Sequence, residues 1–168
     1  SLVKVPIMVA SLIACAQNRL DINRPIVLRR NDKLAGSGSL KNMPVGTAFP
    51  LGRLIGLMIY DSDNTATNII TSLLGIDYLN KVFKAFGLKD TFLLRRVADY
   101  NARKKGIENY TSAKDMALLF EKLYYGKLGS KRISDQCISI LKLTHSNDRI
   151  PRYLPHNVPV AHKTGLER

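Results

Sequence analysis

The sequence lacks the features that mark several large classes of protein. Only two of its 168 residues are cysteines, so at most one disulfide can form. Cys15 and Cys137 both lie on apolar helical stripes, and we expect free, buried thiols. The three histidines lack the close ligand spacing of a zinc site, so we expect no metal and no other cofactor. No apolar run reaches the roughly 18–20 residues that a membrane span requires, and we expect no transmembrane segment in this chain.

Acidic residues are scarce as well. The chain has 13 of them against 26 lysines and arginines, which gives a formal net charge of +13. Such a charge favours either attraction to a polyanion or simple solubility. The basic residues are scattered, without a long run and without an RNA- or DNA-binding motif, so we favour solubility and expect no nucleic-acid partner. The hydrophobic content of 45% predicts a globular chain with a real core.

The hydrophobic periodicity predicts a mostly helical chain. Helices are expected at 2–18, 51–60, 65–74, 77–86 (capped by Asp77), 112–125 (capped by Ser112) and from Ser134 to 142. Apolar residues cover much of the circumference of the first of these, as in a central helix that other elements surround. Residues 29–50 are expected to be an irregular connection and 144–159 a proline-rich loop. Residues 158–163 form the only convincing strand.

Three short motifs carry the chemistry of the chain. They are Ser1-Leu-Val-Lys4, Ser62-Asp63-Asn64 and Lys163-Thr164-Gly165, and 61 residues separate Ser1 from Ser62 and 101 separate Ser62 from Lys163. Each motif alone is weak. A second Ser-x-x-Lys at 139–142 shows that this pattern arises easily by chance, whereas Ser-Asp-Asn and Lys-Thr-Gly each occur once. Together they supply a nucleophile, two proton carriers and a cation for a carboxylate.

The residue types of these motifs fit nucleophilic catalysis. A serine hydroxyl is a poor nucleophile at neutral pH and needs a neighbouring base. Lys4 follows Ser1 by one helical turn, so both side chains can face one cavity. Lysine acts as a base only when burial or another cation lowers its pKa, and Lys163 would be such a cation. The alternative for Ser1 and Lys4 is a helix cap followed by a surface lysine.

The order and spacing of the motifs resemble those of class A β-lactamases and penicillin-binding proteins. Residues 51–74 resemble that family's helix, Ser-Asp-Asn turn and following helix, 109–123 its exit from the omega loop, and 161–165 its active-site edge strand. The resemblance implies an α+β fold, a five-stranded antiparallel sheet flanked by helices. The chain is expected to be the mostly helical central part of one such catalytic domain, residues 1–168, truncated at both ends so that the flanking strands are largely absent. An independent α domain is the alternative.

The resemblance also implies roles for individual residues. Ser1 would be the nucleophile, Lys4 its base and Ser62 the proton shuttle to the leaving nitrogen. Asp63 is expected to cap a helix and hold the turn.

The remaining motif residues would bind substrate. Asn64 would hydrogen-bond the substrate's side-chain amide, and Lys163 and Thr164 would bind its carboxylate. Gly165 would leave room for the substrate, and the backbone N–H of Leu166 would complete an oxyanion hole with that of Ser1.

One segment departs from the family pattern. Class A enzymes release their acyl-enzyme with an omega-loop glutamate, but residues 95–101 hold none at the expected place, and the loop is a few residues short. Asp99 is the nearest carboxylate and our candidate base, with Glu108 as the second choice. The alternative for Asp99 is a solvated loop acid. Arg96 is expected to pin the loop, although the aspartate expected to pair with it is replaced by Asn109.

These observations predict a serine hydrolase that opens β-lactam rings through an acyl-enzyme on Ser1. A D,D-peptidase-like enzyme that releases penicillin slowly is the first alternative, and a non-catalytic peptidoglycan-binding relative or inactive fragment is the second. The expected partner is a small β-lactam or a D-Ala-D-Ala-like peptide. By resemblance we expect a periplasmic or secreted location, although no signal peptide is visible in these residues.

Overall fold

A computed structural model describes residues 1–146, 148–155 and 157–165 of the chain. Its helices are α1 (Lys4–Ala16), α2 (Leu51–Tyr60), α3 (Asn64–Leu74), α4 (Ile76–Ala85), α5 (Tyr100–Lys104), α6 (Ala113–Tyr124) and α7 (Lys131–Lys142). Three short 3₁₀ helices are η1 (Arg30–Asp32), η2 (Leu40–Asn42) and η3 (Ile150–Tyr153). The described part of the chain is mostly helical, as predicted.

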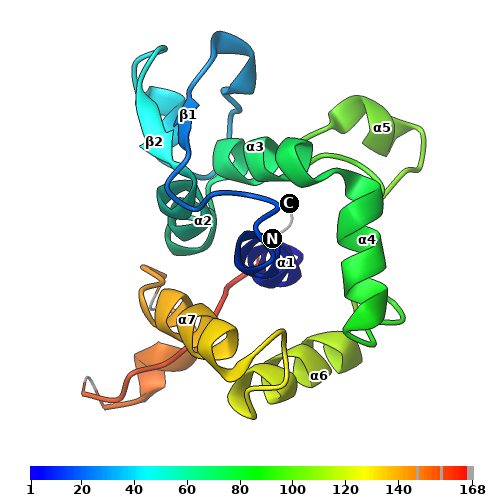
Figure 1. Cartoon of the computed structure of the whole chain (residues 1–168), viewed down its shortest axis with the longest axis vertical. Helices are drawn as coiled ribbons and strands as arrows, with labels where there is room; N and C mark the ends of the chain where they lie inside the picture. Colours follow the sequence, from blue (N-terminus) through cyan, green and yellow to red (C-terminus); the bar gives the residue numbers. More distant parts are fainter. Residues whose placement is uncertain (147, 156, 166–168) are drawn as a thin grey trace.

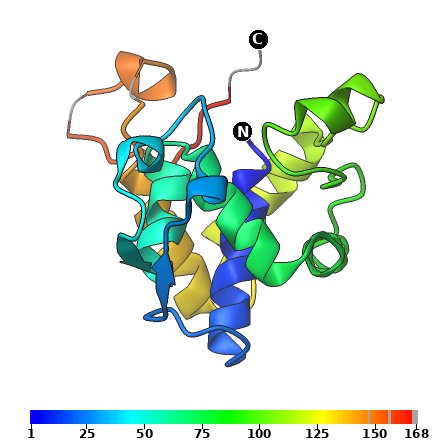
Figure 2. The same cartoon turned by 90° about the horizontal axis from the view of Figure 1, so that it is seen from above.

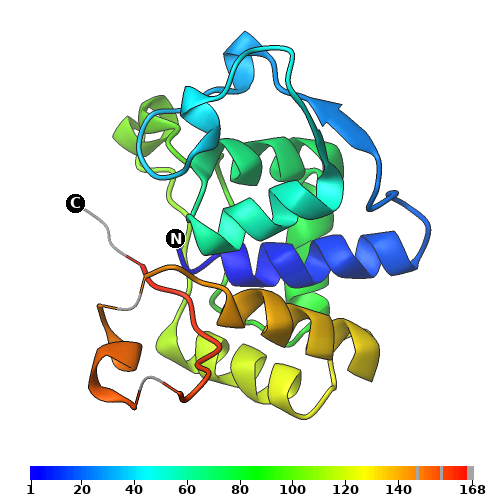
Figure 3. The same cartoon turned by 90° about the vertical axis from the view of Figure 1, so that its left-hand side faces the viewer.

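Helix α1 is the centre of the molecule. Figure 1 shows it nearly end-on, with the other long helices arranged around it, and Figure 3 shows it between α2 and α3 on one side and α6 and α7 on the other. It packs against α2, α3, α4 and α7. Nine consecutive residues, Lys4–Leu12, are buried on it. The prediction of a surrounded central helix is confirmed, because a helix that is apolar nearly all round must bury every face.

The only sheet in the described part of the chain has two short strands. β1 (Pro25–Val27) pairs antiparallel with β2 (Ala48–Pro50), with Ile26 opposite Phe49. The expectation that 29–50 is wholly irregular is therefore wrong at β2, and η1 and η2 also lie in that segment. Strands of three residues are too short to produce an alternating pattern in the sequence.

The helix starts agree in part with the predicted caps. Asp63 caps α3 by accepting a hydrogen bond from the amide of Ala66, and Ser112 caps α6 by accepting one from Asp115. Two predicted starts are wrong. Gly75 is the N-cap of α4, so Asp77 lies in its first turn. α7 begins three residues before Ser134, which is buried and donates to the carbonyl of Leu128.

Two further segments differ from expectation. The sequence did not indicate α5, a five-residue helix in the loop between α4 and α6. Residues 158–163 are not in a strand, and the two strands in the described part of the chain, β1 and β2, pair with each other. Figure 2 shows the Ser1 end of α1 between the loop that follows β1 and the α5 region. The loop that follows β1 and the α5 region therefore lie on either side of the Ser1 end of α1.

Both cysteines are free thiols, as predicted, but only Cys137 is buried, and the expectation of burial is wrong for Cys15, which is partly exposed. Burial raises the pKa of the Cys137 thiol to about 12. None of the helices in the described ranges is long and apolar enough to cross a membrane. Among the described residues no group of three or more histidine, cysteine or acidic side chains is placed to hold a metal ion.

Candidate active site

Lys4 is fully buried in the first turn of α1, and its amine points at the Ser-Asp-Asn turn. Its Nζ donates to the carbonyl oxygen of Ser62 at 2.5 Å, to Ser62 Oγ at 3.0 Å and to Asn64 Oδ1 at 2.9 Å. A buried amine requires such acceptors, because an unpaired buried charge is very costly. The alternative of a surface lysine after a helix cap is thus wrong for Lys4.

The Ser62 hydroxyl is the shared partner of three motif side chains. It accepts hydrogen bonds from Lys4 Nζ at 3.0 Å and from Lys163 Nζ at 3.1 Å, and it donates to Ser1 Oγ at 3.4 Å. Residue Ser62 has φ of 53°, a left-handed conformation that is uncommon outside glycine. This backbone directs both the carbonyl and the hydroxyl of Ser62 at Lys4, so the strained turn brings the three motifs together.

Both lysines are electrostatically perturbed. Burial and the nearby charge of Lys163 lower the pKa of Lys4 to about 7, with Asp63 opposing the shift. Burial lowers the pKa of Lys163 to about 8. Near neutral pH a substantial fraction of Lys4 is therefore the neutral amine that a general base must be, while Lys163 remains mostly cationic.

Asp63 fixes the geometry of the Ser-Asp-Asn turn through hydrogen bonds to two backbone amides. It is fully buried, and its Oδ1 accepts from the amide of Ala66 at 2.8 Å while Oδ2 accepts from the amide of Leu40 at 2.9 Å. Gly38 has φ of 112°, and a Cβ there would lie 2.2 Å from Asp63 Oδ2. The loop 36–40 therefore approaches the turn closely only because glycine occupies this position.

The predicted binding residues lie around the same centre. Asn64 accepts from Lys4 through Oδ1, and its backbone amide donates to the carbonyl of Ser37 at 3.1 Å. The carbonyl of Thr164 accepts from Lys163 Nζ at 2.8 Å. A Cβ on Gly165 would lie 3.2 Å from Cγ of Leu2, which sets this glycine beside the start of the chain. Leu166 lies outside the described residues.

Sequence reasoning missed a polar cluster next to Ser62. Asp61 Oδ2 accepts from Ser39 Oγ at 3.0 Å, and Asp61 Oδ1 lies 2.8 Å from His145 Nδ1. The His145 amide also donates to the carbonyl of Tyr60 at 3.3 Å. Three segments far apart in the sequence thus meet at Asp61. Its place directly before Ser-Asp-Asn was the one available signal.

The same cluster continues toward Lys163. Thr144 Oγ1 donates to the carbonyl of His162 at 2.9 Å, and His162 Nε2 lies 2.7 Å from the carbonyl oxygen of Ser146. The His162 amide donates to the carbonyl of Leu141 at 3.4 Å. These bonds hold the residue that precedes Lys163 against the end of α7, which keeps the Lys163 amine at Ser62.

The loop between α4 and α6 is pinned differently from expectation. Asn109 Oδ1 accepts from the amides of Leu94 and Arg95, and Arg95 pairs with Glu108 at 2.6 Å. Hydrogen bonding to Arg95 lowers the pKa of Glu108. The expectation that Arg96 pins the loop is wrong, because its neighbour Arg95 makes the ion pair.

Asp99 and Val97 occupy the part of this loop nearest to α3. Asn68, one turn after Asn64, holds Val97 by two hydrogen bonds of 2.9 Å to its amide and carbonyl. The Asp99 carboxylate accepts from the amide of Ala102 at 3.0 Å and thereby caps α5. Its catalytic role stays a prediction.

With this geometry established, the class of protein follows. The residue pattern of the Beta-lactamase enzyme family matches residues 1–167, which is nearly the whole chain. The chain therefore belongs to this family.

Several relatives are similar over most of the chain. Beta-lactamase VEB-1 of Pseudomonas aeruginosa is 27% identical over 175 residues, covering 98% of this chain and 58% of the relative. A β-lactamase from Sphaerobacter thermophilus is 32% identical with a TM-score of 0.83, covering 91% of this chain and 58% of that one. PBP-A is 31% identical with a TM-score of 0.86, covering 97% and 60%. The chain thus spans about 60% of the length of these relatives, and the α+β fold assignment is confirmed for that part.

Proposed function

We propose that this protein is a serine hydrolase that opens β-lactam rings through an acyl-enzyme on Ser1. The observation that carries the proposal is the shared contact of Ser62 Oγ with Ser1 Oγ, Lys4 Nζ and Lys163 Nζ. Membership of the Beta-lactamase enzyme family supports hydrolase chemistry. Turnover of a chromogenic cephalosporin tests the proposal. By family resemblance we also propose a periplasmic or secreted location.

The proposed acylation is a proton relay between three side chains. The neutral amine of Lys4 takes the proton of the Ser1 hydroxyl as Ser1 Oγ attacks the lactam carbonyl carbon. The C–N bond then breaks, and Ser62 passes its hydroxyl proton to the leaving nitrogen and is reprotonated by Lys4. Lys4 and Ser62 end in their starting states, and the proton that left Ser1 is carried by the leaving nitrogen.

Substrate binding is assigned to the residues that surround this relay. Lys163 and Thr164 would take the substrate carboxylate, because a cation beside a hydroxyl is suited to an anionic oxygen pair. Asn64 would bind the side-chain amide, and Gly165 would leave room for substrate beside Ser1. The backbone amides of Ser1 and Leu166 would stabilise the oxyanion.

A D,D-peptidase-like enzyme that releases penicillin slowly is the second candidate. Its support is the loop at Asp99, where the only carboxylate in 95–101 already caps α5. PBP-A, similar over 97% of this chain, is described in a mutant form as an acyl-enzyme complex with penicillin G. If fluorescent penicillin labels the protein while the cephalosporin is not turned over, this candidate is favoured. Absence of labelling would point to a non-catalytic cell-wall-binding relative.

The pH dependence of acylation should be bell-shaped with its maximum between about 7 and 8. The rate should rise through about 7, where Lys4 loses the proton that prevents it from acting as a base. It should fall above about 8, where Lys163 loses the charge that binds the carboxylate. Stopped-flow measurement of acylation by a reporter β-lactam, between pH 5.5 and 9.5 at constant ionic strength, gives both the rising and the falling limb of the profile. A rate that is flat between pH 6 and 9 would contradict both assignments.

Asp99→Asn should leave the acylation burst intact and slow the release of product. We expect the parent to show a burst followed by slow turnover, because a base displaced by about 1 Å can cost on the order of 10²-fold in rate. Asparagine caps a helix as well as aspartate does, so the variant removes the carboxylate while α5 is kept. Asp135→Asn on α7 is the control. Equal release by variant and parent would exclude Asp99 as the base and leave Glu108 or Lys4.

A further inference from the structure

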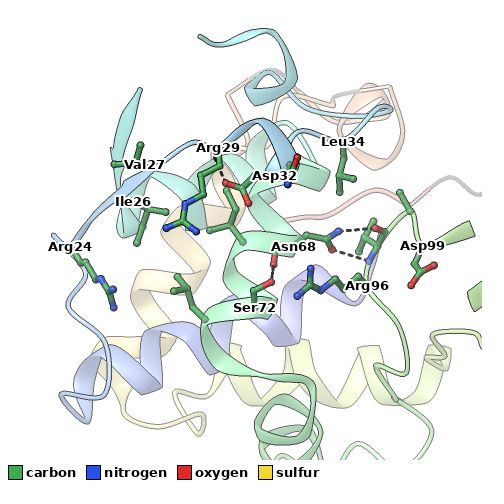
Figure 4. A pocket seen from close by; sticks show the side chains of 15 residues that line it. Arg24, Ile26, Val27, Arg29, Asp32, Leu34, Asn68, Ser72, Arg96 and Asp99 are labelled. Atoms are coloured by element: carbon green, nitrogen blue, oxygen red, sulfur yellow. Dashed lines mark hydrogen bonds between the residues drawn. The ribbon is translucent and has the colours of Figure 1, made fainter. Parts of the chain in front are cut away.

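A cavity lies on the side of α3 that faces β1, η1 and the loop 96–99. Its volume is about 490 Å³, within the range of small-molecule sites. The end of β1, η1, α3 and the loop 96–99 all contribute to its lining, as Figure 4 shows. None of Ser1, Lys4, Ser62 and Lys163 lines it. The cavity therefore does not contain the side chains proposed for acylation, although Asp99, the candidate base for product release, lies in its wall.

Three arginines from three segments line this cavity. Arg24 precedes β1, Arg29 follows it, and Arg96 lies in the loop that leads to α5. In Figure 4 the guanidinium of Arg29 and that of Arg96 lie on two sides of the hollow, with Arg24 at a third. Within the described ranges, none of the three is in an ion pair. Their charges are thus available to a ligand.

Three other polar side chains of the lining, Asp32, Asn68 and Asp99, make hydrogen bonds within the protein. Asp32 Oδ2 accepts from the amide of Arg29 at 2.8 Å, and Asp99 Oδ1 accepts from the amide of Ala102 at 3.0 Å. Both ends of the Asn68 amide bond Val97. Three arginines against two aspartates leave a formal charge of +1 on the lining. The donors without a protein partner therefore exceed the acceptors, which favours an anion.

Apart from Asn31 and Ser72, the remaining lining is apolar. Its apolar residues are Ile26, Val27, Leu34, Ile69, Leu73, Val97 and Ala98. All three arginines are exposed, so their hydrogen bonds to a ligand would form in contact with solvent. The apolar side chains favour a ligand with a short apolar or neutral spacer between its charged ends.

We propose that this cavity binds a small dianion with two oxygen-bearing charged groups, carboxylate or phosphate, which Arg29 and Arg96 anchor at its two ends. A guanidinium presents a planar fork of donors that matches such groups two oxygens at a time. Arg24 supplies further positive charge at the third side. Because Arg96 belongs to the loop that carries Asp99, a bound dianion would link that loop to the segment after β1.

Calorimetric titration of the whole chain with succinate and with inorganic pyrophosphate tests this site. We expect one equivalent of at least one probe to bind with a Kd of about 1 mM or tighter. The stronger probe assigns the ligand to carboxylate or phosphate chemistry. Arg29→Gln and Arg96→Gln should each weaken binding at least about fivefold, since each removes one charge-assisted anchor. Thermal unfolding of each variant checks that its fold is intact.

Arg132→Gln is the matched control, because it removes the same charge from an exposed position on α7. It should leave the affinity unchanged within about twofold, because Arg132 does not line the cavity and the exposed charge is screened by salt. If it weakens binding as much as Arg29→Gln does, the overall positive charge of the protein and not this cavity attracts the anion. Failure of both probes to bind at millimolar concentration also overturns the proposal.

Discussion

Ser1→Ala should abolish covalent labelling of the protein by benzylpenicillin. Ser1 Oγ is the oxygen that Ser62 Oγ contacts at 3.4 Å, next to two amines with lowered pKa values. Without this oxygen the ester bond of the acyl-enzyme cannot form, so the loss of labelling should be complete and not partial. Intact mass measurement after incubation with penicillin, followed by peptide mapping of the parent, gives the result.

The chain supplies its own matched control for this experiment. Ser139 belongs to the second Ser-x-x-Lys, but it lies on α7 and its hydroxyl donates to the carbonyl of Asp135 at 2.9 Å. Ser139→Ala should be labelled like the parent. An adduct mapped to Ser139 or to any other serine, or a parent that forms no adduct, would contradict the assignment of Ser1 as the nucleophile.

Lys4→Ala should slow acylation by at least about 10²-fold, the usual contribution of a positioned base. The reason is its position, since the amine is fully buried and donates to both the carbonyl and the hydroxyl of Ser62. Single-turnover kinetics with a reporter penicillin measure the rate constant. The acid limb of the pH profile near 7 should also disappear, because the group that titrates there is gone.

Lys142→Ala is the corresponding control, since Lys142 ends the second Ser-x-x-Lys on α7. Its acylation rate should equal that of the parent. Thermal unfolding separates the loss of a base from a loss of fold, because Lys4→Ala also leaves Ser62 and Asn64 without a buried donor. A well-folded Lys4→Ala protein with an unchanged rate would assign the base elsewhere.

Much of the helical fold could be predicted from the sequence. α1 and α2 follow from their apolar periodicity, and the caps Asp63 and Ser112 follow from residue types that accept hydrogen bonds from free amides. These signals are local, so they can be recognised without knowledge of the tertiary structure. The pairing of β1 with β2 and the absence of a strand at the described residues of 158–163 depend on which segments meet, and no local pattern contains that information.

The motifs of the candidate site were likewise readable along the chain. Ser1, Lys4 and Lys163 at these spacings indicated a nucleophile, a base and a carboxylate-binding cation before any geometry was known. The residue types, their order and the lack of a glutamate in 95–101 are all evident from the sequence. The motifs alone could not show whether Lys4 and Lys163 both contact the hydroxyl of Ser62.

Only the tertiary structure decided that convergence. The left-handed turn at Ser62, the close approach of Gly38 to Asp63 and the cluster of Asp61 with His145 bring distant segments within hydrogen-bonding distance. The lowered pKa of Lys4 arises in the same way, from burial and from a charge 159 residues further along the chain. Local sequence determined the helices and the reactive groups, because propensity and side-chain chemistry act over a few residues. Burial, strain and charge proximity determined the site, because they exist only once the chain is folded.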